Sequence, residues 1–400
     1  MRTKCDDYLK KVEYKTLFVL FLLAFIVRFL YVRWGLWWAG DSPDYLAIAK
    51  NIAFHHSFSH TTGIPTASRP PLYPFLIAAF WWTDKAPIAV VMLVQIMCGA
   101  ATVLLTYLIA RDRFNRRVAL IAALGMTFAP MTVHYTAVTL TETLFTFLLI
   151  LGAYFWGRNR AVAAGFAFGL AALTRTTVIP FLACLPLLAL LPHWRNHRRL
   201  YLLIFVSAIG VSSIWIIRNS LVFKKFILVQ SGGYGANLFA GTIEFPFYGD
   251  DVWTKVIKQL DSNEADEAGR DRIYVRQAID RIQSDPARYL RARLKQYPRL
   301  FLDSGDYLLG SRNVTFNEAL HERRTLVVIT KLSFMLGNIG IFLLAVYGSF
   351  LERKRLVALS HIILFPVFLS LVHLPMWIEN RYSLPMMPLV LILAVRGIQR

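Results

Sequence analysis

Cysteine and charge are both scarce in this 400-residue sequence. Its three cysteines, Cys5, Cys98 and Cys184, form no CxxC pair and have no histidine at ligand spacing. Neither a disulfide framework nor a zinc site is therefore indicated. Charged residues make up 17% of the chain, against about a quarter in an average soluble domain. This shortage of charge argues against an ordinary soluble protein.

Hydrophobic residues take the place of the missing charge. They account for 56% of the chain, and aromatic residues for 14%. The net charge is +20, but the basic residues stand in short clusters between apolar runs, as in the cytoplasmic loops of membrane proteins. We therefore expect a multi-pass protein that contacts the lipid bilayer and binds no nucleic acid.

The amino terminus begins with a basic lead, MRTKCDDYLKKVEYK, followed by an apolar run from Thr16 to about Trp34. That run is longer than the roughly 7 to 15 apolar residues of a cleavable signal peptide, and no small-x-small cleavage site follows it. An uncleaved first transmembrane helix is the prediction.

Apolar runs of about 20 residues and the Arg-rich loops between them predict the membrane topology. With the amino terminus in the cytoplasm, alternation gives about ten crossings and places both termini on the cytoplasmic side. The predicted crossings are 16–37, 86–110, 118–132, 144–156, 161–173, 178–191, 200–217, 326–350, 356–374 and 384–395. The fold class is thus an all-α polytopic membrane protein.

Three parts follow from this topology. Residues 1–217 hold transmembrane helices 1–7 and a first outer loop, 37–85, which is expected to carry the catalytic site and an interfacial helix pair. Residues 218–325 form a polar outer segment in which apolar residues recur at helical spacing and Asp285-Pro286 marks a helix start. Residues 326–400 hold transmembrane helices 8–10.

Polar residues that membranes usually exclude gather on the outer side of this topology. Charge at a membrane edge is costly and marks a candidate functional site by default. A carboxylate can take a proton from a hydroxyl, and a guanidinium can hold a phosphate through two hydrogen bonds. The set therefore suits displacement of a sugar from a lipid phosphate. Its members are Asp41, Asp44, Arg69, Glu142, Arg175, Arg218, Asn219, Glu379, Asn380 and Arg381.

Structural explanations compete at the same positions. Asp41 could cap the helix that follows it, and Glu142 could be a first-turn acid stabilised by the helix dipole. The arginines could extend to lipid headgroups. His55, His56 and His60 resemble a metal cluster, but they lack the carboxylate support of such sites, which favours a solvated loop.

The order of the outer motifs resembles the GT-C superfamily of membrane glycosyltransferases. The resemblance is strongest to the bacterial branch that is similar to dolichyl-phosphate-mannose protein mannosyltransferases and the lipid A aminoarabinose transferase. The matching motifs, which span nearly the whole chain, are GDSPDY, RPPLYP, TETLF, GLAALTR, WIIRNS, QSGGYGANLFAG, DPARYLRARLKQYPRLF and NRYSLPMMPLV.

This resemblance implies an inverting glycosyltransferase on the outer, periplasmic face of a bacterial inner membrane. Its donor would be a sugar on a polyprenyl monophosphate such as undecaprenyl phosphate. Its acceptor would be lipid A, another glycolipid, a polysaccharide or a protein.

The resemblance also assigns roles to residues. Asp41 matches the first-loop acid of the family, the candidate general base, and Glu142 matches a second acid. Arg69 precedes the PP pair and would hold the donor phosphate, with Arg218 or Arg381 beside it. The expected substrate-binding residues are Tyr45, Arg175, Asn219, Gly232, Gly233 and Asn380.

Several alternatives stay open. Ser42 stands where many relatives carry a second acid, so either Asp41 or Asp44 is the base. Some GT-C relatives use a divalent ion, so Mg²⁺ or Mn²⁺ is compatible with two acids in one loop, although no metal ligands are assigned. The alternative functions are a lipid or sugar transporter or flippase, and an oligosaccharide ligase with a diphosphate donor. Transporters often contain related halves, and the sequence has no internal repeat.

Overall fold

The computed structural model describes residues 2–35, 40–243, 267–303, 305 and 316–399. Within these ranges the regular structure is helical, and the single strand-like pairing joins Ser59 to Pro65. The all-α prediction is therefore confirmed for the part of the chain that is described. A helix satisfies its own backbone hydrogen bonds, which is why apolar segments take this form in lipid.

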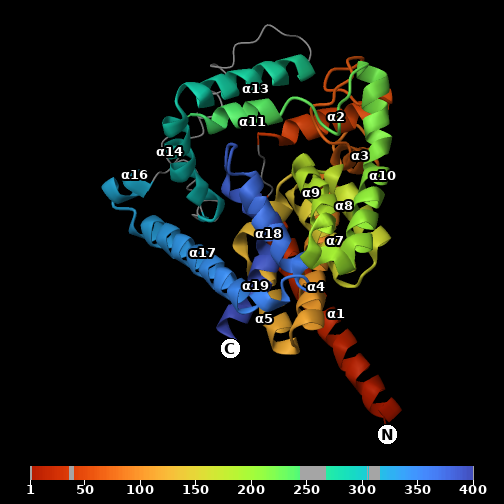
Figure 1. Ribbon diagram of the computed structural model, residues 1–400, viewed down its shortest axis with the longest axis vertical. Helices are drawn as coiled ribbons and strands as arrows, with labels where there is room; N and C mark the ends of the chain where they lie inside the picture. The colour runs from red at the N-terminus through yellow and green to blue at the C-terminus, as the bar shows by residue number, and fades with distance from the viewer. Residues whose placement is uncertain (1, 36–39, 244–266, 304, 306–315, 400) are drawn as a thin grey trace.

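The apolar helices pack into a bundle around one extended core (Figure 1). Both termini lie at the same end of this bundle. The helices are α1 (Arg2–Trp34), α4 (Ile88–Arg113), α5 (Arg116–Phe128), α6 (Pro130–His134), α7 (Glu142–Gly157), α8 (Ala161–Ala172), α9 (Ile179–Leu190), α10 (Arg198–Phe223), α17 (Thr325–Leu351), α18 (Ser360–Val372) and α19 (Met387–Ile398).

Each predicted crossing corresponds to a helix, but the number ten is not confirmed. Among the described residues, five helices are long and apolar enough to cross a membrane: α1, α4, α10, α17, and α19 with the turn before it. A sixth candidate is α5 with α6, which bend by 54° after Ala129 because a residue before proline disfavours helical geometry. The shorter apolar helices are α7, α8, α9 and α18.

A second group of helices lies at the end of the bundle opposite the termini (Figure 1). It includes the first-loop pair, α2 (Ser42–His55) and α3 (Leu72–Ala78), and the outer-segment helices α11 (Tyr234–Gly241), α13 (Glu267–Ser284) and α14 (Pro286–Gln296). A further short helix, α16 (Phe316–His321), precedes α17. The predicted start of α14 is confirmed, because the Asp285 side chain accepts a hydrogen bond of 2.8 Å from the Arg288 amide.

Close helix contacts in the bundle depend on glycine. A Cβ atom on Gly165 of α8 would lie 2.5 Å from the Ile204 carbonyl oxygen of α10, and one on Gly169 would lie 2.8 Å from that of Ala208. Small residues at such positions let two backbones approach each other. These glycines allow α8 to pack directly against α10. That packing sets the position of the loop after α8, which carries Arg175.

Candidate active site

The first-loop helix pair positions two acids and one arginine. Asp41 stands at the N-cap of α2, but its side chain makes no capping hydrogen bond, so the capping explanation does not account for it. Behind the acids, Tyr45 of α2 packs edge-on against Tyr73 of α3, with ring centroids 5.3 Å apart. This contact sets α3 beside α2 and brings Arg69, which precedes α3, to the start of α2.

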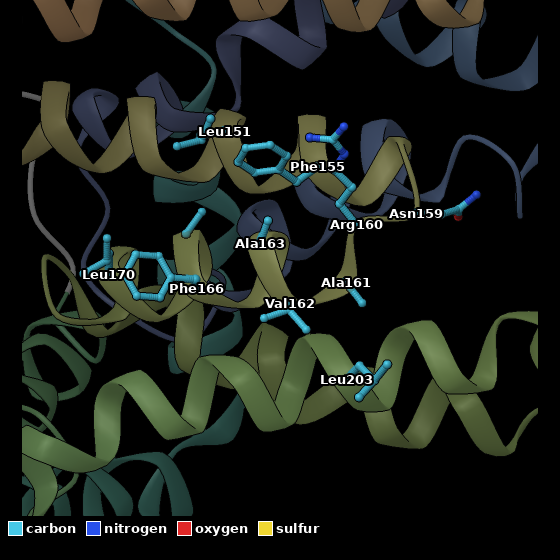
Figure 2. A pocket seen from close by; sticks show the side chains of 11 residues that line it. Leu151, Phe155, Asn159, Arg160, Ala161, Val162, Ala163, Phe166, Leu170 and Leu203 are labelled. Atoms are coloured by element: carbon cyan, nitrogen blue, oxygen red, sulfur yellow. The ribbon is translucent and has the colours of Figure 1, made fainter.

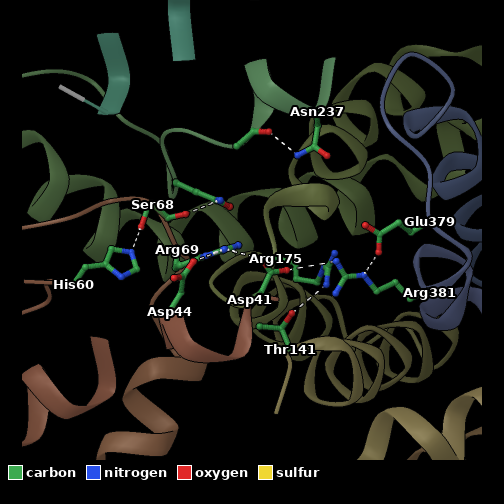
Figure 3. Close-up of polar contacts among 12 residues, drawn as sticks. Asp41, Asp44, His60, Ser68, Arg69, Thr141, Arg175, Asn237, Glu379 and Arg381 are labelled. Carbon is green, nitrogen blue, oxygen red and sulfur yellow. Dashed lines mark hydrogen bonds and ion pairs between the residues drawn. The ribbon is translucent and has the colours of Figure 1, made fainter. Parts of the chain in front are cut away.

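Arg69 bridges Asp41 and Asp44 of the first loop (Figure 3). Its Nη2 atom lies 2.7 Å from Oδ1 of Asp41 and 2.6 Å from Oδ2 of Asp44. The guanidinium also lies 5.3 Å from the ring centroid of Tyr45. Since both carboxylates share one nitrogen, and no other described residue accepts from Arg69, its Nε and Nη1 atoms are left for a further acceptor.

A second group, built on α7 and two loops, faces the first. Arg175, which follows α8, places Nη1 2.7 Å from Oε1 of Glu142 at the start of α7 and 3.1 Å from the Thr141 hydroxyl. Only 2% of the Glu142 side chain is exposed. Its other carboxylate oxygen, Oε2, has no hydrogen-bond partner among the described residues. A buried acid with one oxygen unpaired is unusual away from functional sites.

Arg381 joins the two groups. Its Nη2 atom lies 3.4 Å from Oδ2 of Asp41, its Nη1 atom 3.6 Å from Oε1 of Glu142, and its Nε atom 2.6 Å from Oε2 of Glu379. Asp41 is therefore held between two arginines that come from opposite ends of the chain. We call this set the carboxylate–arginine cluster; it comprises Asp41, Asp44, Arg69, Glu142, Arg175, Glu379 and Arg381.

The electrostatics of the cluster keep Asp41 ionised. Burial by itself would raise the pKa of this carboxyl, but the charges of Arg69 and Arg381 outweigh it and hold the pKa below its ordinary value of 3.8. Asp44 is the most exposed of the acids, at 43%. Asp44 can therefore give up its contact with Arg69 and be solvated by water at a lower free-energy cost than Asp41.

Two residues of the site have no role that the sequence predicts. Glu379 is the ion-pair partner of Arg381 Nε. The guanidinium groups of Arg175 and Arg381 both lie 5.7 Å from the ring centroid of Tyr382. The adjacency of these residues in ENRY to Arg381 was the available signal.

Arg218 lies apart from this cluster. Its Nη1 atom donates to the Thr66 carbonyl at 3.0 Å, its Nη2 atom donates to the Phe58 carbonyl at 3.4 Å, and its guanidinium lies 4.7 Å from the Trp215 ring. These contacts fasten the first loop to α10. The expected contact of Arg218 with a donor phosphate stays a prediction without a matching geometry.

The other expected substrate-binding residues have structural contacts of their own. Asn219 is buried and donates to the Val229 carbonyl at 3.3 Å, and Asn380 donates to Oδ1 of Asp303 at 3.4 Å. Gly232 has a φ of +87°, a conformation that favours glycine. The Gly233 carbonyl accepts a 2.6 Å hydrogen bond from Asn237 (Figure 3). The structure places these residues around the outer loops rather than in the cluster.

The cluster does not fit a divalent ion in this arrangement. Within the described residues, no group of three or more His, Cys, Asp and Glu side chains is placed to hold a metal. Between Asp41 and Asp44 lies a nitrogen of Arg69, where a shared cation would need to be. His60, from the histidine group, pairs instead with the Ser68 hydroxyl at 2.7 Å. We therefore derive no step through a metal.

Comparison with known proteins gives one family model that matches part of the chain and several solved structures of similar fold. A family model described as dolichyl-phosphate-mannose-protein mannosyltransferase matches residues 68–217. That range contains Arg69, Glu142 and Arg175 of the cluster. The archaeal oligosaccharyltransferase AglB from Archaeoglobus fulgidus, in complex with an inhibitory peptide and a dolichol-phosphate, shares the fold, with a TM-score of 0.56 and 14% identity over 98% of this chain. The chain thus resembles membrane glycosyltransferases of this kind in sequence over residues 68–217, and it shares a fold with the archaeal enzyme.

Further solved structures extend the comparison. An Archaeoglobus fulgidus oligosaccharyltransferase in complex with Zn and sulfate has a TM-score of 0.55 and 13% identity, over 96% of this chain and 48% of that one. ArnT from Cupriavidus metallidurans bound to undecaprenyl phosphate has a TM-score of 0.47 and 15% identity, over 95% and 77%. The present chain spans about half the length of AglB, 50% of which is covered. No curated protein matches it.

Proposed function

We propose that this protein is a GT-C-type inverting glycosyltransferase that moves a sugar from a polyprenyl-monophosphate donor to an acceptor hydroxyl. The observation that carries the proposal is Asp41, an ionised acid held between Arg69 and Arg381. It stands at the start of α2, a helix at the end of the bundle opposite the termini. A base and a phosphate-binding cation side by side are what displacement of a lipid phosphate requires.

Arg69 is the proposed donor-phosphate ligand. Its Nε and Nη1 atoms are uncommitted, whereas all three nitrogens of the Arg381 guanidinium have a carboxylate within 3.6 Å. Each two-nitrogen edge of the Arg69 guanidinium includes Nη2, so a phosphate bound there would compete with Asp44, the more exposed acid. The arginine would then neutralise charge on the departing phosphate, a task that a metal ion performs in other enzymes.

Asp41 is the proposed general base. It would take the proton of the acceptor hydroxyl while the hydroxyl oxygen attacks C1 of the donor sugar from the face opposite the phosphate. The new C–O bond forms as the C1–phosphate bond breaks, so the configuration at C1 inverts and the polyprenyl phosphate leaves with the bonding electrons. Partial withdrawal of Arg69 by the donor phosphate would make Asp41 a stronger base at that moment.

Glu142 is the proposed contact for the acceptor, and the residues around it and around Arg69 act as positioning residues. Arg175 and Arg381 fix Glu142, whose unpaired Oε2 is available to accept a hydrogen bond from the acceptor. Tyr45 supports the Arg69 guanidinium from below through its ring. The environment we propose is a bacterial inner membrane, with both termini cytoplasmic and the cluster at the periplasmic face, where a lipid-linked donor meets an acceptor such as lipid A, another glycolipid, a polysaccharide or a protein.

Donor competition tests this function. The purified protein in lipid nanodiscs would receive a panel of polyprenyl-monophosphate sugars and matched diphosphate sugars, and release of the free lipid phosphate would be followed. Turnover of a monophosphate donor, with a product of inverted configuration, is the expected result. Turnover of diphosphate donors alone would identify an oligosaccharide ligase instead and would overturn the proposal.

A further inference from the structure

A long apolar groove runs along the outside of α7, α8 and α10 (Figure 2). Its volume is about 700 Å³. Phe155 of α7, Phe166 and Leu170 of α8, and Leu203 of α10 line it. Asn159 and Arg160, in the turn between α7 and α8, lie toward one end, and Leu170 lies at the other. The groove therefore has a polar end and an apolar body.

The length of the groove corresponds to one leaflet of a bilayer. From Ala161 to Leu170 the helix rises about 14 Å, at about 1.5 Å per residue. The hydrocarbon core of a bilayer is about 30 Å thick, so the groove extends across about half of it. The polar end lies on the side of the termini, because Arg113 at the end of α4 donates to the carbonyl of Gly157, three residues before Arg160.

Arg160 is a cation without a counter-ion at this end. Its neighbour Arg158 pairs with Asp112, with Nε 2.9 Å from Oδ2, and packs over Tyr154. Arg175, beyond the other end of α8, pairs with Glu142. By contrast, no described residue accepts a hydrogen bond from the Arg160 side chain or forms an ion pair with it. A guanidinium at the end of an apolar groove is suited to bind an anion that carries an apolar chain, because the charge pairs with the anion and the chain packs in the groove.

We propose that this groove binds one anionic phospholipid of the leaflet on the side of the termini, with an acyl chain along α8 and the phosphate on Arg160. The ligand differs from the proposed donor. A polyprenyl donor would place its phosphate beside Arg69, at the opposite end of the bundle, and would leave Arg160 unpaired. The site is thus independent of the glycosyl-transfer reaction.

Lipid binding to the delipidated full-length protein tests the proposal. Native mass spectrometry would measure the binding of phosphatidylglycerol and phosphatidylcholine to the wild type, Arg160→Ala, Val162→Trp and Arg195→Ala. Val162 lines the groove and is 63% exposed, so a tryptophan there fills the groove without entering the core. Arg195 is exposed, lies outside the groove and serves as the charge-matched control.

The expected result is preferential binding of phosphatidylglycerol that Arg160→Ala weakens about tenfold. Binding of phosphatidylcholine should weaken less in that variant, because its choline cation offsets the phosphate charge. Val162→Trp should reduce the occupancy of both lipids, and Arg195→Ala should match the wild type. Equal loss in Arg160→Ala and Arg195→Ala would mean that only the overall charge matters and would overturn the site. Preferential occupancy by a polyprenyl phosphate, lost in Val162→Trp, would overturn the assigned ligand.

Discussion

The Nη2 atom of Arg69 lies 2.7 Å from Oδ1 of Asp41, although 28 positions of sequence separate the two residues. The intervening chain is the α2–α3 pair, so this ion pair closes the first outer loop on itself. The same nitrogen serves Asp44, which leaves Nε and Nη1 without a carboxylate among the described residues.

This shared geometry predicts that lysine cannot replace Arg69. An ammonium group can keep the charge, but it lacks the planar fork that contacts two carboxylates and a phosphate together. Arg69→Lys should lower kcat for lipid-phosphate release about 100-fold. Steady-state kinetics with a monophosphate donor measure this, and Arg195→Lys, an exposed change, is the control. Wild-type turnover in Arg69→Lys would remove Arg69 from the reaction.

The ionisation of Asp41 predicts the pH dependence. Its pKa in the folded protein lies below the ordinary value of 3.8, so its ion pairs stabilise the fold above that value and are lost as the pH falls through the lowered pKa. The acid limb of the kcat/KM profile should accordingly lie below pH 3.8. Arg69→Gln removes a charge that lowers the pKa and should move any residual limb upward. An acid limb near neutral pH that Arg69→Gln leaves in place would show that another group controls it.

Much of this cluster could be predicted from the sequence, because membrane-edge charge is costly wherever it occurs. Alternation of the crossings put Asp41, Arg69, Glu142, Arg175 and Arg381 on one side, and the structure brings these five into one network. Their catalytic roles stay predictions. The sequence pattern does not predict which acid pairs with which arginine. That depends on where α2, α7 and the turn before α19 meet in the folded protein.

Arg218 illustrates the limit of that reasoning. By sequence it is as anomalous as Arg381, since both follow apolar runs at the same predicted face. The structure separates them, because the Arg218 guanidinium donates its hydrogen bonds to the carbonyl oxygens of Phe58 and Thr66. Irregular loops leave backbone carbonyls unpaired, and no sequence pattern tells which arginine will satisfy them.

The number of crossings was equally beyond the sequence pattern. A crossing straight through the bilayer needs about 20 apolar residues, and α8 has 12. Hydropathy registers such a helix as an apolar run, but only its packing against α7 and α10 determines how far it extends through the bilayer.

Removal of Glu142 should destabilise the fold. Its side chain is almost fully buried between Arg175 and Arg381. Glu142→Ala therefore removes one carboxylate partner from each of these arginines. Breaking a buried ion pair in this way costs about 3 kcal/mol. Glu322→Ala, which breaks an exposed pair with Arg324, should cost under about 1 kcal/mol. Thermal melting in detergent compares the two variants, and equal melting temperatures would show that Glu142 adds nothing to stability.

The stability of the fold should also be sensitive to a single added methyl group at the contact between α17 and α19. A Cβ on Gly348 would overlap the Leu393 carbonyl oxygen, and one on Gly397 would lie 2.5 Å from that of Leu344. Gly348→Ala should therefore lower stability by about 1–3 kcal/mol. Gly340, in the same helix, has open space around its Cβ position, and Gly340→Ala should be neutral or slightly stabilising. Equal melting temperatures of the two variants would show that the stability of the fold does not depend on this close approach of α17 and α19.

Substitution of the two first-loop acids separates the base from its neighbour. Asp41→Asn keeps the shape of the side chain but cannot accept the proton, and loss of a general base costs about 10² to 10⁴ in rate. The fold should persist, because Arg69 keeps Asp44 while Arg381 keeps Glu142 and Glu379. Melting temperature and binding of the donor lipid verify that.

Asp44→Asn should cost less than tenfold, since Asp44 only shares Arg69 and is the acid that a donor phosphate would displace. The reverse ranking would place the base at Asp44, three residues further along α2. Full activity in both variants, with a wild type that turns over the same donor, would remove the first loop from the chemistry and leave Glu142, with its unpaired oxygen, as the carboxylate to examine.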